Sequence, residues 1–448
     1  MSRHRRALRI MVVVLIPLGI WTIAGLITFW PGDVSEHIAQ DVSGYSVAGV
    51  TYPTARITNI TEMPCEGMAG STPGVNNQTC ANLAAELLEG AEKGQTVEVP
   101  LTDAIYASGT KIGQQIKLIR IPPLDGQPAQ YQFSDFQRGT PLLVLTLLFA
   151  AAVVIVARWR GFASLIGLSF AGFILVKFMF PALISGSNPL VIGLIGSSAI
   201  MFVVLYAAHG FSARTTTALL GTLFGLILIA CLGYAVTRWA HLTGVTAEDD
   251  YVLAAAAPDL RLTSVVICGI IVAGLGVLND VTITQASAVW ELADSDPNQK
   301  RLFSSAMRIG RDHIASTVYT IAFATAGAAL PVLLLIAIYE RPMLEVVQTE
   351  QFASEVIRTL VGSIGLVLAV PLTTAVGVAV VRASRRRGQP ASARKPAPPA
   401  GSGASSASTG EPKQRRRRKS RDSFDDFDDF SDLREPTEES ETKSRRPQ

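Results

Sequence analysis

Long apolar stretches separated by short polar segments run through the chain up to about residue 381 and then stop. An α-helix needs about 20 apolar residues to cross about 30 Å of hydrocarbon. Windows of this kind lie at 8–30, 140–157, 162–181, 189–208, 215–238, 262–288, 315–339 and 356–381. A helix satisfies its backbone amides internally, as lipid requires. The pattern therefore predicts an all-α polytopic transmembrane helical bundle of about eight spans.

This pattern divides the chain into four expected parts. Residues 1–30 form an N-terminal cytoplasmic segment and first transmembrane anchor, 31–139 an extracytoplasmic β-rich domain, 140–381 a transmembrane bundle of seven further spans, and 382–448 a disordered cytoplasmic tail. A basic start followed by an apolar core would also suit a cleaved signal peptide. We expect an uncleaved anchor, because ITFWPGD offers no small-x-small cleavage site.

Lys and Arg collect in alternate loops, which sets the expected orientation. The residues predicted to face the cytoplasm are Arg3, Arg5, Arg6, Arg9, Arg158, Arg160, Arg214, Lys300, Arg301, Arg308, Arg311, Arg385, Arg386 and Arg387. The intervening loops contain few basic residues, and 245–259 is acidic. With an even number of spans, both termini are expected in the cytoplasm of a bacterial cell, with the bundle in its plasma membrane.

Short β-rich runs punctuated by Gly, Pro and Asn characterise the segment 31–139. Strands are expected at Ser46–Val50, Ala55–Thr61, Thr96–Val99 and Gln115–Ile121, in a small barrel of OB-like or similar type. Cys65 and Cys80 are the only cysteines there, and an oxidising compartment favours a disulfide between them, which would contribute about 3 kcal/mol. Cys231 and Cys268 lie in expected spans, where a free thiol packs as a small apolar group. We find no metal-ligand cluster and no catalytic constellation in this segment.

The C-terminal tail is rich in Arg, Pro, Ser and Gly and cannot bury enough apolar surface to fold alone. Its basic blocks beside the last span favour attachment to anionic lipids of the bilayer. Nucleic-acid binding is not expected, because no aromatic residues interleave with these blocks. The acidic-aromatic run at residues 423–430 suits a short motif that docks on a protein partner, although it also suits a solvated tail.

The most unusual apolar window ends in the sequence GVLNDVTITQASAVWEL, at residues 276–292. On a helix Asp280, Thr284, Ser287 and Glu291 share one face, because they are spaced four, three and four residues apart. Asn279, Thr282 and Gln285 flank this face. In the other direction Gly276, Ala273 and Gly269 continue it with small residues that allow close helix approach. The candidate polar transmembrane site is Asn279, Asp280, Thr284, Gln285, Ser287 and Glu291.

Depth leaves two interpretations of this polar face open. Asp280 lies about 27 Å along a helix that begins near Leu262, so the polar residues could simply mark where the helix leaves the membrane. A carboxylate within a span is costly, however, and usually faces a bundle interior or a wet cavity. Arg308, Arg311 and His313 follow in the next segment and could return beside Asp280 or Glu291.

The stretch GVLNDVTITQASAVWEL, together with FPALISGSNPLVIGLIGS at residues 180–197, resembles the YibE/F family of bacterial membrane proteins. Six residues carry the resemblance: Gly276, Asp280, Ser287, Ala288, Glu291 and Leu292. It covers roughly residues 100–381, and Asn279 stands where the family has Met or a similar residue. The resemblance implies a multi-pass plasma-membrane protein and implies no particular biochemical role.

A gradient-driven transporter or channel for a small solute or ion is the function that we favour. Asp280 would bind a cation or move a proton along the polar helix face, and Gly276 with Asn279 would be the place for a helix break. The alternative is a non-transporting envelope scaffold or sensor that acts through its outside domain and tail. We expect no enzyme and no cofactor, since the chain lacks a second intramembrane Asp motif, HExxH, Gly-x-Ser-x-Gly and a Walker-type loop.

Overall fold

The computed structural model describes residues 4–39, 49–65, 79–123, 128–295, 301–339 and 342–385. Five strands and twelve α-helices lie within these residues. The strands are β1 (Thr54–Pro64), β2 (Thr79–Leu87), β3 (Thr96–Leu101), β4 (Gln115–Ile121) and β5 (Gln130–Phe136). The helices are α1 (His4–Thr28), α2 (Asp103–Ala107), α3 (Gly139–Ile174), α4 (Phe180–Ile184), α5 (Pro189–His209), α6 (Ala213–Trp239), α7 (Glu248–Ala256), α8 (Leu262–Ser295), α9 (Leu302–Ala328), α10 (Leu330–Tyr339), α11 (Met343–Val347) and α12 (Glu350–Arg385).

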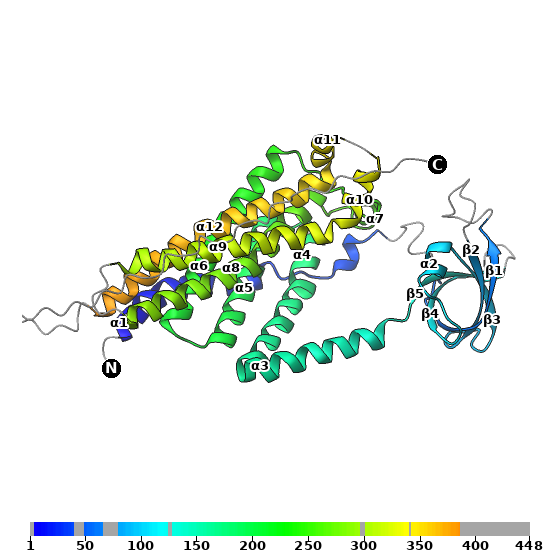
Figure 1. The fold of residues 1–448 in the computed structure, drawn as a ribbon, viewed down its shortest axis with the longest axis horizontal. Coiled ribbons are helices and arrows are strands. Elements are labelled where there is room, and N and C mark those ends of the chain that lie inside the picture. Colours follow the sequence, from blue (N-terminus) through cyan, green and yellow to red (C-terminus); the bar gives the residue numbers. More distant parts are fainter. Residues whose placement is uncertain are drawn as a thin grey trace, which may run out of the picture. The chain divides into compact units, whose positions relative to one another are not determined.

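The strands form one antiparallel sheet in the order β3-β2-β1-β4-β5. The two outer strands, β3 and β5, also approach each other, so the sheet curls into a small barrel (Figure 1). Its core is apolar, with Ile57, Leu83, Val99 and Leu118 buried. The expected strands at 55–61, 96–99 and 115–121 are present. β2 and β5 were not expected, and Gly49 and Val50 of the expected strand 46–50 lie outside any strand, while its residues 46–48 are not described.

The predicted disulfide between Cys65 and Cys80 is confirmed. Cys65 directly follows β1, and Cys80 lies in β2 opposite Met63 of β1. The antiparallel register therefore brings the two Cα atoms to 5.0 Å, which is within the range that a disulfide needs. The bridge joins the ends of two neighbouring strands.

Five helical stretches of the described chain are long and apolar enough to cross a membrane, and a bent pair of helices makes up to six. The five are Gly139–Ile184, Pro189–His209, Ala213–Trp239, Leu262–Ser295 and Glu350–Ala383, and the bent pair is α9 with α10. α1 contributes a shorter apolar stretch, Leu15–Thr28. Eight spans are therefore not confirmed. The expected windows 140–157 and 162–181 both fall within the single stretch Gly139–Ile184.

A sharp corner divides that stretch at Arg158, whose backbone is non-helical with a φ of 54° and a ψ of −133°. Positive φ is unfavourable for a residue with a side chain. The surrounding structure must therefore hold Arg158 in this conformation. Gly161 lies just after it, and a Cβ at that position would collide with the backbone carbonyl of Val153. The corner thus coincides with the loop that the basic residues Arg158 and Arg160 predicted.

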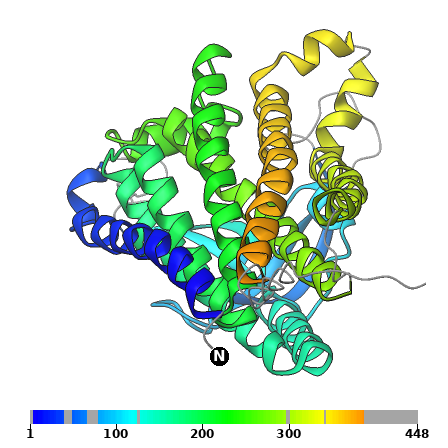
Figure 2. The same cartoon turned by 90° about the vertical axis from the view of Figure 1, so that its left-hand side faces the viewer.

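α6, α8 and α12 pack together at the centre of the helical part, and α9 lies against α8 and α12 (Figures 1 and 2). The centre is apolar, with Leu226, Ile271, Leu278 and Ala369 fully buried. Small residues bring the helices close: Cβ atoms at Gly225 and Gly274 would meet Leu278 and Ile229 at less than ordinary contact distance. This core holds α8, the helix with the candidate polar face, in a fixed register.

The tail from residue 386 onwards lies outside the described residues. The expected lipid-binding blocks and the motif at 423–430 fall there. α12 itself continues to Arg385, four residues past the expected end of the last span.

Candidate functional site

The polar face that the sequence predicted on α8 is the face that its neighbours leave uncovered. Five residues of this face are exposed, namely Ala273, Gly276, Asp280, Thr284 and Glu291, and two are half-buried, namely Gly269 and Ser287. We call this row of seven residues the open face of α8. The opposite side of the helix, including Leu278, Val281, Ala286 and Val289, is buried.

Gln285 belongs to the buried side and not to the open face. It is only 2% exposed, and its Nε2 donates to the carbonyl of Ala306 on α9 at 2.9 Å and to the hydroxyl of Thr374 on α12 at 2.7 Å. Thr282, also buried, shares a hydrogen bond of 2.7 Å with Thr222 on α6. Buried polar groups must find such partners. These two residues therefore tie α8 to three neighbouring helices.

His313 of α9 lies beside Asp280 on the open face. His313 Nε2 on α9 lies 3.9 Å from Asp280 Oδ2, and the Asp280 side chain is 71% exposed. Both His313 Nε2 and Asn279 Oδ1 are buried without a hydrogen-bond partner in the described part of the chain. Of the three residues expected to return beside Asp280, His313 does so. Arg308 and Arg311 are exposed, and no ion pair joins them to Asp280 or Glu291 among the described residues.

The hydroxyl groups of Thr284 and Ser287 donate hydrogen bonds within α8, to the carbonyls of Asp280 and Ile283 respectively. Their oxygen atoms keep lone pairs for a further partner. Glu291 stands exposed toward the C-terminal end of the helix. The structure thus keeps Asp280, Thr284, Ser287 and Glu291 on one face, as the spacing predicted, and separates Gln285 from them.

A cavity of about 510 Å³ lies at the other end of the open face, where α9 gives way to α10. We call it the α9-break cavity. Gly269 of α8 lines it, together with residues from α7 and the loop before it, from α9, from α10 and from the first turns of α12. Its polar lining includes Thr246, Asp250, Thr325, Gln351, Glu355 and Arg358. Apolar side chains of Val265, Val332 and Phe352 complete the wall.

The break between α9 and α10 bends the chain by 69°. Its cause is Pro331, which has no N–H to donate to the carbonyl of Gly327 and whose ring would clash with that carbonyl in a continuous helix. The amide of Val332 instead donates to Ala329 at 3.1 Å, which starts α10. The helix break expected near Gly276 and Asn279 is therefore wrong: α8 is continuous from Leu262 to Ser295, and the break occurs in α9–α10.

Arg358 and Glu355 are the charged pair of this cavity, and the sequence reasoning missed both. Arg358 NH1 donates to Glu355 Oε1 at 2.6 Å, while Arg358 Nε is buried without a hydrogen-bond partner among the described residues. The sequence does contain a signal for this pair: Glu355 and Arg358 are spaced i, i+3 where the apolar window 356–381 begins, so a helix places them side by side. Nearby, Thr325 and Thr359 share a hydrogen bond of 3.1 Å, which joins α9 to α12.

Asp250 contributes a fixed negative charge to the same cavity. Its Oδ2 accepts from the backbone N–H groups of Thr246 at 2.7 Å and Ala247 at 2.9 Å, and from the Thr246 hydroxyl. The backbone hydrogen bond from Thr246 is the main reason that the pKa of Asp250 lies below its usual value. The carboxylate is therefore ionised at neutral pH.

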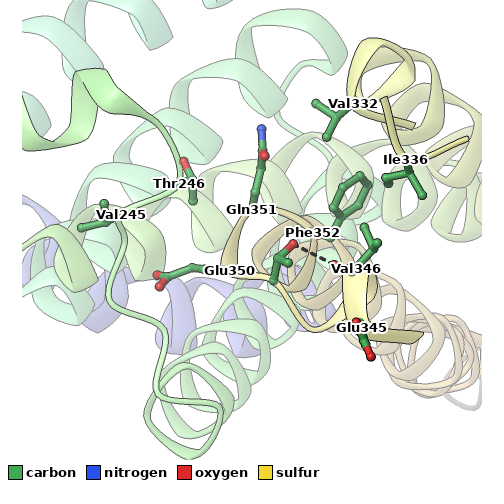
Figure 3. Close-up of a pocket in the computed structure, with 10 residues that line it drawn as sticks. Val245, Thr246, Val332, Ile336, Glu345, Val346, Glu350, Gln351 and Phe352 are labelled. Carbon is green, nitrogen blue, oxygen red and sulfur yellow. Dashed lines mark hydrogen bonds between the residues drawn. The ribbon is translucent and has the colours of Figure 1, made fainter. Parts of the chain in front are cut away.

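A second cavity, of about 660 Å³, adjoins the first and shares Thr246, Val332, Gln351 and Phe352 with it. Figure 3 shows Phe352 directed toward Ile336 and Val332, while Glu350 points the other way, toward the loop at Val245. Glu350 is occupied there, because it accepts from the hydroxyl of Thr243 and the amide of Gly244. Within the described residues, no three His, Cys, Asp or Glu side chains are grouped so that they could hold a metal ion.

Apolar helices of spanning length around a polar helix face and a lined cavity define an α-helical membrane protein. The family model of the YibE/F-like protein matches residues 145–383, which include α5 to α10 and most of α3 and α12, and the chain belongs to this family. No curated protein and no solved structure matches the chain.

Proposed function

We propose that this protein is a gradient-driven transporter or channel for a small solute or ion, and that the open face of α8 forms one wall of the path. The observation that carries the proposal is the continuity of this face. It begins at Gly269, inside the α9-break cavity, and reaches Asp280 about 16 Å further along the helix. The cavity and the Asp280 carboxylate, with His313 beside it, thus lie on one uninterrupted surface.

The broken helix supports the same proposal. Solute sites in secondary transporters are typically formed where a transmembrane helix is interrupted, because the interruption frees backbone groups for the solute. Here α9 ends beside the cavity, and Thr325, Ala328 and Ala329 at this end line it. No Walker-type loop is present in the sequence, so a gradient would drive transport. The proposal includes no enzymatic step.

The proposed setting is the bacterial plasma membrane, with both termini in the cytoplasm and residues 31–139 outside. In this topology the corner at Arg158 divides Gly139–Ile184 into two spans, and α1 and the bent pair α9–α10 complete eight. The disulfide of the β-domain supports an outside location, since such bonds persist in oxidising compartments. The basic tail would bind anionic lipids, and residues 423–430 would serve a protein partner.

The experiment measures solute-induced currents from proteoliposomes that contain the full chain, with a panel of ions, amino acids, sugars and organic acids. Replacing Asp280 by Asn should reduce the current of the transported solute by about tenfold or more, because the charge on the path is removed. The matched control is Asp312→Asn, which removes an exposed carboxylate of α9. Equal currents from D280N and wild type would exclude Asp280 from the path. A wild type without any solute-dependent current would contradict transport and favour the envelope scaffold or sensor.

A further inference from the structure

Arg358 keeps one edge of its guanidinium free. NH1 is held by Glu355 at 2.6 Å, whereas Nε has no hydrogen-bond partner in the described chain although it is buried. NH2 faces α8 at Gly269. A Cβ atom built on Gly269 would lie 4.0 Å from this NH2, so the glycine leaves space in front of it. The Nε–NH2 edge of an arginine is the fork that binds a carboxylate or phosphate through two parallel hydrogen bonds. A buried donor without an acceptor is energetically costly. An anionic group bound at this edge would supply the missing acceptor.

The rest of the cavity carries an excess of negative charge. Two carboxylates, Asp250 and Glu355, line it against the single guanidinium of Arg358. The C-terminal end of α9 adds partial negative charge, because the last carbonyls of a helix carry the negative end of its dipole. Ala328 and Ala329 of this helix end line the cavity. A cation near Glu355 and this helix end would balance the excess.

We propose that the α9-break cavity binds a small organic zwitterion of the amino-acid or short-peptide class. Its carboxylate occupies the free edge of Arg358, and its ammonium group lies between Glu355 and the C-terminal end of α9. An apolar side chain packs on Val265, Val332 and Phe352. This inference deepens the proposed function and rests on it, because it names the class of solute that the path would carry.

Isothermal titration calorimetry on the full chain in lipid nanodiscs tests the inference with four probes. Leucine and leucyl-leucine carry both charges, 3-methylbutylamine lacks the carboxylate of leucine, and 4-methylpentanoate lacks its ammonium group. We expect binding of at least one zwitterion and about tenfold or more weaker binding of both single-charge probes. The loss of one charge-assisted contact has this magnitude.

Three variants locate the site. Arg358→Gln should weaken zwitterion binding about tenfold to hundredfold, and Arg358→Lys, which keeps the charge but loses the fork, should also weaken it. Gly269→Leu should block binding by filling the cavity without changing any charge. The matched control is Arg238→Gln on α6, whose arginine contacts Tyr234 and does not line the cavity. Its affinity should equal that of the wild type.

The outcomes separate this inference from the proposed function. Equal affinity of a single-charge probe, unchanged affinity of R358Q, or no binding of either zwitterion at about 10 mM would overturn the inference. Transport of a different class of solute that R358Q leaves intact would overturn it while the transporter stands. Binding of a zwitterion that depends on Arg358, without any solute-dependent current, would support the site and contradict transport.

Discussion

Asp280 and Gln285 show how strongly the role of a polar residue in this helix depends on its direction. The two lie five residues apart on α8, which rotates their side chains to different sides of the helix. Asp280 remains exposed beside His313, whereas Gln285 is buried and bonded to α9 and α12. Under the proposed function, the first would meet the solute. The second holds the helices in register, so its loss would affect folding before it affected a path.

The carboxylate of Glu92 in the β-domain is held by three hydrogen bonds from two side chains. It accepts two hydrogen bonds from Arg120, at 2.7 and 2.6 Å, and one from the Tyr131 hydroxyl at 2.6 Å. The hydrogen bonds from Arg120 are the main reason that its pKa is lowered to about 2. A lowered pKa in the folded state means that the unfolded state binds more protons between about pH 4.5 and pH 2.

Glu92 should therefore stabilise the β-domain fully above about pH 4.5 and lose this effect as the pH falls through about 2. Replacing it by Gln should lower the stability of the domain by about 2 kcal/mol at pH 6, since Arg120 loses its ionic partner. Hydrogen exchange of peptides from β4 and β5, corrected for the intrinsic rate at each pH, measures the difference between wild type and E92Q. A difference of the same size at pH 6 and pH 2 would contradict the assignment.

At the scale of elements, the break between α9 and α10 is the feature that creates the cavity. A continuous helix would carry Val332 and the residues after it straight on from α9, and Pro331 prevents this. The bend of 69° instead leaves the end of α9 beside the first turns of α12. Without this proline we expect a straight span and no cavity at this place.

Replacing Pro331 by Ala should restore a backbone donor for the carbonyl of Gly327 and straighten α9–α10. Spin labels at Tyr319 and Ile338, both exposed, report the change. A straight helix would place these two positions about 28 Å apart, and the bent one places them closer. Electron–electron double resonance on the full chain should therefore give a longer distance for P331A than for the unmutated sequence. Identical distance distributions would show that the proline does not cause the bend.

Helical spacing predicted the open face of α8 correctly, because side chains three and four residues apart must share a side. It could not show whether neighbouring helices cover that side, and so it grouped Gln285 with residues that point elsewhere. β2 was missed for a different reason. Its buried residues Ala81, Leu83, Ala85 and Leu87 alternate as a strand requires, but alanine has little preference for strands.

At the scale of the whole molecule, the number of spans depends on the corner at Arg158. Hydropathy predicted two spans around this residue, and the helical stretch Gly139–Ile184 passes through it without a loop. Length alone does not decide between one span and two. The backbone at Arg158 does provide a physical reason for two, since a φ of 54° ends one helical direction and begins another. The family match begins at residue 145 and includes the corner.

Two crossings place both ends of Gly139–Ile184 on the same side of the membrane, whereas a single crossing places them on opposite sides, and this difference can be measured directly. If the stretch crosses twice, cysteines at Ser134 and Ser187 should both react with a membrane-impermeant maleimide added to intact cells, and one at Trp159 should react only after the membrane is opened. These sites flank the corner, and Trp159 is 76% exposed. The native Cys65 and Cys80 are protected by their disulfide, and Cys231 is replaced by Ser. Labelling of Ser134→Cys and Ser187→Cys from opposite sides would show a single crossing. It would also reverse the orientation of every helix from α5 onwards, and with it the side of the membrane from which a solute reaches the α9-break cavity.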